Sequence, residues 1–177
     1  STFFSLWLFN EAITMDMTRA EAFKLSTGFY VMVQAFAIPG AVLINFFIDK
    51  VDRVMALAIS MFIAACGYLY LGFIDDIFSS RMYFGAALLG LGEIFANISA
   101  ISLIGSAAPA KGRGAVIGGF SFFGAIGILL VASIGGYLFD NVGPTAPFTM
   151  VGFANVALLT LALLLLFFES RKDNLNS

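Results

Sequence analysis

The sequence has no histidine, a single cysteine and few charged residues. Charged side chains make up 11% of its 177 residues, and the net charge is −2. Without histidine, the commonest metal ligand and general base is missing, and one cysteine, Cys66, cannot form an internal disulfide. The charge balance also shows no excess of basic residues of the kind that nucleic-acid binding requires. We therefore expect no metal site, no cofactor, no nucleic-acid partner and no enzyme activity.

Apolar residues dominate the chain instead. They make up 60% of it, and the mean hydropathy is +0.99, whereas soluble domains average roughly 45–50% apolar residues. Long apolar segments, each long enough to cross a bilayer as a helix, lie at about residues 24–48, 54–74, 82–104, 114–139 and 146–168. In lipid, backbone polar groups must pair within such a segment. The sequence therefore predicts an all-α, polytopic membrane protein.

The first ten residues form an apolar stretch that is too short to span a bilayer. We interpret residues 1–10 as part of a truncated first helix, which with the five longer segments gives a six-helix bundle. Thr18 and Glu21 stand three residues apart before the second segment, and this spacing predicts a capping box at a helix start.

Lysine and arginine are distributed unequally between the two sides of the predicted bundle. One side has six of them and the other has Arg19, Lys24 and Arg81. The six are Lys50, Arg53, Lys111, Arg113, Arg171 and Lys172. Because cytoplasmic loops carry the excess of basic residues, we expect the C-terminus to be cytoplasmic.

Glu93 is the ionisable residue within the apolar segment 82–104. It lies 12 residues after Arg81, roughly 18 Å along a helix, which places it near the bilayer midplane. Asn97 follows one turn later and shares its face. A carboxyl at this depth is costly and is usually functional, so we expect a proton or cation site, or a partner for substrate. The alternative is a protonated structural carboxyl bonded to a neighbouring helix.

The other apolar segments differ from one another in their polar and small side chains. Tyr30 and Gln34 lie on one polar-to-small face of segment 24–48; we expect this face to line a cavity, the alternative being helix–helix hydrogen bonding. Segments 54–74 and 146–168 have no ionisable residue at depth and are expected to be peripheral and lipid-facing. Segment 114–139 is rich in glycines expected to pack helices closely, among them Gly118, Gly124, Gly127, Gly135 and Gly136.

Two stretches resemble the major facilitator superfamily of transporters. Residues 45–54, NFFIDKVDRV, are similar to the family's loop motif G-x-x-x-D-[RK]-x-G-R-[RK], with matches at Asp49, Lys50 and Arg53. Asn45 and Asp52 replace its two glycines, and Val54 replaces its last basic residue. In residues 108–148, a basic link followed by RG, a glycine-rich helix and GGYLFD resembles the family's eleventh helix and the turn into the twelfth.

The resemblance implies that residues 1–177 are the C-terminal transmembrane half of such a transporter, its seventh to twelfth helices. The N-terminal half of the same protein would then be missing and would be a partner, together with the lipid bilayer and a small-molecule solute. The resemblance further implies that Asp49, Lys50 and Arg53 belong to a cytoplasmic loop latch; the alternative is a solvated loop. Trp7, in the N-terminal stretch, joins Glu93 among the cavity candidates.

The function that the sequence favours is secondary active transport. We expect a carrier that moves a small solute across the cell membrane, the inner membrane if the source is bacterial, by alternating access. A proton or ion gradient or the solute's own gradient would drive it, and Glu93 is the candidate for proton coupling. The sequence does not distinguish symport, antiport and uniport, because these modes of transport use the same structural elements. The alternative is a non-transporting membrane sensor or a scaffold subunit.

Overall fold

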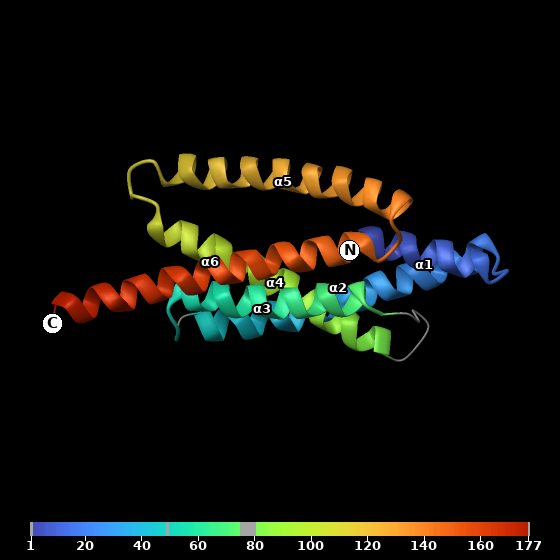
Figure 1. Cartoon of the computed structure of the whole chain (residues 1–177), viewed down its shortest axis with the longest axis horizontal. Coiled ribbons are helices and arrows are strands. Elements are labelled where there is room, and N and C mark those ends of the chain that lie inside the picture. Colours follow the sequence, from blue (N-terminus) through green and yellow to red (C-terminus); the bar gives the residue numbers. More distant parts are fainter. Residues whose placement is uncertain (1, 49, 75–80, 177) are drawn as a thin grey trace.

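The computed structural model of the chain describes residues 2–48, 50–74 and 81–176. These residues form six helices and no strand: α1 (Thr2–Thr14), α2 (Arg19–Ile48), α3 (Arg53–Gly72), α4 (Arg81–Ala107), α5 (Arg113–Asn141) and α6 (Ala146–Asn176). Helices α2 to α6 each contain a segment long and apolar enough to cross a membrane. Figure 1 shows the helices running along a shared long direction. The predicted all-α, polytopic fold class is confirmed.

Side-chain caps fix where α2 and α3 begin. The Thr18 amide donates to Glu21 Oε2 at 3.0 Å, and the Glu21 amide donates to Thr18 Oγ1 at 3.4 Å. The predicted capping box is thus confirmed, and α2 begins at the next residue, Arg19. Asp52 Oδ1 accepts from the amides of Val54 and Met55 at 2.8 and 3.2 Å. Asp52, which stands where the family motif has a glycine, therefore serves as the N-cap of α3.

The centre of the bundle is an antiparallel contact between α3 and α4 at backbone distance. A Cβ built on Gly92 would lie 2.6 Å from the Cα of Ala64, and one built on Gly67 would lie 2.9 Å from the amide nitrogen of Leu89. Further along the same contact, the buried hydroxyls of Ser60 and Ser99 are hydrogen-bonded at 2.9 Å. Only glycine fits at positions 67 and 92 without moving backbone.

Helix α2 packs against another face of α4 in the same way. A Cβ on Gly90 would run into the carbonyl oxygen of Val33, and one on Gly40 would lie 2.7 Å from the side chain of Leu91. Helix α2 continues through Pro39 to Ile48. Helix α4 therefore lies between α2 and α3, with glycines facing each neighbour.

The expectation that α3 is peripheral and lipid-facing is wrong. In its most apolar window 44% of the residues are buried, against 22% or less in each of the other four candidate spans. Helix α3 is enclosed because α6 packs on it opposite α4, with Gly72 against Thr149 and Gly152 against Leu69. The absence of Asp, Glu, Lys and Arg within the apolar part of α3 does not indicate lipid contact here, since small side chains bring neighbouring helices close.

Helix α5 lies at the edge of the bundle (Figure 1). None of the residues in its most apolar window is buried. Of the glycines expected to pack helices, Gly135 meets Phe3, with 2.7 Å from a built Cβ to the ring. Nothing lies within 4 Å of a Cβ built on Gly118, Gly124, Gly127 or Gly136. A packing role for these four stays a prediction.

The contact between Gly92 and the α3 backbone provides a test of the fold. We expect Gly92→Ala in the full-length protein to lower its stability by about 1–3 kcal/mol, because overpacking displaces backbone. Gly105→Ala on the same helix is the matched control, since nothing lies within 4 Å of a Cβ at Gly105. Thermal unfolding of the purified proteins measures both, and equal midpoints for the two variants would contradict the close α3–α4 contact.

Candidate functional site

Three of the predicted site residues line one small cavity between α2 and α4. Glu93 and Asn97 come from α4 and Gln34 comes from α2, and the cavity has a volume of about 150 Å³. Ala37, Gly90 and Ile94 complete its described lining. The Glu93 side chain is half-buried, while Gln34 and Asn97 are exposed. The structure therefore brings together a carboxyl and two carboxamides in the middle of the long apolar helices.

The local geometry explains why these three side chains meet. Glu93 and Asn97 are one helical turn apart, so they share a face of α4. Gly90, one turn before Glu93 on that face, admits the α2 backbone at Val33, which brings Gln34 alongside. The Gln34 amide nitrogen in turn donates to the Tyr30 hydroxyl at 3.1 Å. Tyr30 therefore adjoins the site through Gln34.

Trp7 is placed elsewhere. Its side chain is 4% exposed and belongs to a buried apolar cluster with Phe4 and Phe148. Its ring centroid lies 5.8 Å from that of Phe148. The structure thus packs Trp7 between α1 and α6 and does not bring it to the described lining of the Glu93 cavity.

Tyr68 is the site residue that the sequence analysis missed. Its hydroxyl donates to Glu93 Oε1 at 2.6 Å, linking α3 to α4. A distance this short is typical of an O–H···O⁻ hydrogen bond. A tyrosine deep in an otherwise apolar helix is a usable signal, because a buried phenol hydroxyl needs a polar partner. Which helix supplies that partner depends on the packing and could not be read from the sequence.

The Tyr68 side chain also borders a second, larger cavity. This cavity has a volume of about 470 Å³ and lies between α1, α3, α5 and α6. Its other described lining residues are Phe3, Gly124, Gly127, Ile128, Val131, Ala132, Pro147, Phe148 and Val151. Apart from the Tyr68 hydroxyl, these side chains are apolar. One residue, Tyr68, therefore borders the apolar cavity and reaches the carboxyl of the polar one.

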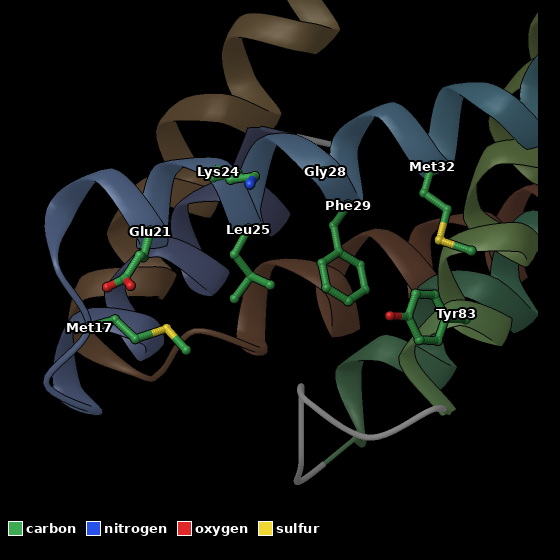
Figure 2. A pocket seen from close by; sticks show the side chains of 8 residues that line it. All are labelled: Met17, Glu21, Lys24, Leu25, Gly28, Phe29, Met32 and Tyr83. Carbon is green, nitrogen blue, oxygen red and sulfur yellow. The ribbon is translucent and has the colours of Figure 1, made fainter.

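A third pocket lies at the beginning of α2, where α2 faces α4 (Figure 2). Its floor is apolar, and the rings of Phe29 and Tyr83 stack there with centroids 5.4 Å apart. Glu21 and Lys24 add charge to it. Because Glu21 is held by the α2 capping box, we assign this carboxylate to helix initiation.

The loop between α2 and α3 contains the predicted latch. Asp49 lies outside the described residues. Lys50 is exposed, and its amide donates to the carbonyl of Phe47 at 3.0 Å. Arg53 is exposed at the first position of α3. A latch formed by these residues stays a prediction.

Long apolar helices packed at backbone distance characterise a multi-pass membrane protein. The chain belongs to the Major Facilitator Superfamily, whose family model matches residues 1–177. The resemblance found in the sequence is thereby confirmed.

Three curated relatives are similar to most of this chain. Magnetosome protein MamH of Paramagnetospirillum magneticum is 31% identical over 169 residues, which are 96% of this chain and 39% of MamH. Magnetosome protein MamZ of the same organism and MamZ of Magnetospirillum gryphiswaldense are each 28% identical over 152 residues, 86% of this chain and 24% of MamZ. The chain thus spans well under half the length of these relatives. No solved structure matches it.

The polar cavity predicts a difference in water access between two positions on α4. In the full-length protein with Cys66→Ser, we expect Asn97→Cys to react with a membrane-impermeant thiol reagent, because Asn97 is exposed and lines the cavity. Ser99→Cys is the matched control, since Ser99 is fully buried. Labelling is read by mass spectrometry. Failure of Asn97→Cys to react from either side of the membrane would show that the cavity is sealed in the whole protein.

Proposed function

We propose that this chain is part of a secondary active transporter that moves a small solute by alternating access and is proton-coupled through Glu93. The observation that carries the proposal is the place of the carboxyl, in a cavity shared with two carboxamides at mid-depth in α4. Inserting a charged residue at the bilayer centre costs about 2.5–3.5 kcal/mol. A helix that keeps such a group in a polar cavity is suited to binding and releasing a proton.

The neighbours of Glu93 suit both protonation states. A carboxylate only accepts hydrogen bonds, whereas a protonated carboxyl also donates one. Gln34 and Asn97 each carry a donor and an acceptor in their amide groups, so they can serve either form without a change of partner. In carriers of this type, two halves rock around a site at mid-depth. Protonation of Glu93 would then be favoured on one side of the membrane and deprotonation on the other.

Replacement of the carboxyl tests proton coupling. We expect Glu93→Gln to reduce solute-driven proton flux to the level of protein-free vesicles, because glutamine is similar in shape but cannot titrate. Flux is measured with a pH-sensitive dye trapped in proteoliposomes that contain the full-length protein, while a panel of small solutes is applied. Glu11→Gln, near the end of α1, is the matched control and should leave the flux unchanged.

The outcomes of this assay separate the alternatives. Proton flux in Glu93→Gln that equals the wild-type value would refute coupling through Glu93 while leaving transport intact. Absence of solute-driven proton flux in the wild-type protein across the whole panel would refute the proton-coupled carrier and favour the non-transporting sensor or scaffold.

The exposed face of α5 supports a packing contact with another segment of the parent protein. Nothing lies within 4 Å of a Cβ on four of the glycines on α5 that were expected to pack helices, and MamH and MamZ are much longer than this chain. We propose that an N-terminal half of the same protein packs against α5. Glycines permit a close helix contact in lipid, which explains why a helix without a tight partner in this chain is so rich in them.

The distribution of basic residues supports an orientation with the C-terminus in the cytoplasm. We propose the cell membrane as the location. The similarity to the magnetosome proteins MamH and MamZ favours a magnetosome as the second candidate location, and fractionation of cells that carry a tagged protein distinguishes the two.

Reporter fusions test the orientation. We expect green fluorescent protein fused after Ser177 to be fluorescent, and alkaline phosphatase fused there to be inactive, because the positive-inside rule places this end in the cytoplasm. Fusion at Gly143, in the link between α5 and α6, is the control and should give the opposite result. Active phosphatase at Ser177 would reverse the proposed orientation.

A further inference from the structure

The hydrogen bond between Tyr68 and Glu93 lies between two backbone contacts. Tyr68 directly follows Gly67, which meets the backbone of Leu89, and Glu93 directly follows Gly92, which meets the backbone of Ala64. Both partners are thus attached to points where α3 and α4 cannot shift without a clash. The main chain therefore fixes the two backbone positions from which the Tyr68 hydroxyl and Glu93 Oε1 meet at 2.6 Å.

The Tyr68 ring and the Tyr68 hydroxyl lie in different surroundings. The ring packs against the buried apolar cluster and borders the apolar cavity of about 470 Å³ between α1, α3, α5 and α6. Its hydroxyl is directed instead to Glu93, which lines the polar cavity between α2 and α4. The side chain therefore links the apolar core to the carboxyl on α4.

We infer that Tyr68 is a positioning residue for Glu93: its hydroxyl holds one carboxyl oxygen and thereby sets the orientation of the carboxyl. This inference rests on the proposed proton-coupling role of Glu93. The geometry supports it, because a short hydrogen bond is directional and holds the accepting oxygen on the side of α3.

The groups around Glu93 on each packed helix define what else acts on it. From α3, the titratable group in contact is Tyr68. From α2, Gln34 faces the same cavity, and the titratable Tyr30 adjoins it through the Gln34 hydrogen bond. From α4 itself, Asn97 shares the cavity. Among these described residues, Tyr68 is the one whose hydroxyl is placed directly on the carboxyl by a short hydrogen bond.

Infrared spectroscopy of the full-length protein in lipid tests the inference without a known solute. The carbonyl stretch of the protonated Glu93 carboxyl is followed as a function of pH and assigned by its loss in Glu93→Gln. We expect Tyr68→Phe to raise the frequency of this band, because the carboxyl loses a hydrogen bond. Tyr68→Phe keeps the ring, so packing is retained.

Tyr70→Phe is the matched control. Tyr70 lies on the same helix, and its ring packs edge-to-face on Phe84 with centroids 5.5 Å apart, a contact that phenylalanine keeps. We expect Tyr70→Phe to leave the frequency of the Glu93 band unchanged. A second variant covers the case in which Tyr68→Phe does not fold: a fluorinated tyrosine at position 68 is a stronger donor and should lower the frequency of the band.

The possible results separate this inference from the proposed function. A Glu93 band that has the same frequency in the wild-type protein, in Tyr68→Phe and with fluorinated tyrosine would overturn the positioning role and leave proton coupling in place. A loss of thermal stability in Tyr68→Phe with an unchanged band would assign Tyr68 a structural role only. Absence of any titrating Glu93 band in the wild-type protein would overturn both proposals.

Discussion

The contact of α4 with its two neighbours at backbone distance is the constraint on which the rest of the structure depends. In lipid, no hydrophobic force drives helices together, so van der Waals packing and interhelical hydrogen bonds must do so. Gly90 opens α4 to the α2 backbone, and Gly92 opens it to the α3 backbone. Glu93 follows these glycines directly, and its environment is therefore set by two rigid contacts rather than by a loop.

This arrangement explains how the chain retains a carboxyl at membrane depth. Tyr68 from α3 donates to it at 2.6 Å, and Gln34 and Asn97 line the cavity beside it. The buried hydrogen bond between Ser60 and Ser99 fastens the same pair of helices further along their contact. Polar groups thus lie where the helices are closest. Glu93 and Ser99 on α4 are each hydrogen-bonded to a hydroxyl on α3, which offsets the cost of removing them from water.

Sequence reasoning predicted the parts that follow from local chemistry. Helix type follows from apolar length, the start of α2 follows from Thr18 and Glu21, and the pairing of Glu93 with Asn97 follows from the helical period. It did not predict the partner of Glu93, the burial of Trp7 or the enclosure of α3. These depend on how each helix is rotated about its axis, and a uniformly apolar helix provides no amphipathic pattern from which that rotation could be read.

The same limit explains the contrast between the glycines of α4 and those of α5. In both helices glycine indicates only that close approach is possible. On α4, the approach is made within this chain, and on α5 it is made at Gly135, against Phe3. The contacts among α2, α3, α4 and α6 therefore form a tightly packed body that holds the carboxyl in place. Much of α5 lies exposed at the edge of this body. Such a division would suit a carrier in which one body keeps the site intact while another part moves against it.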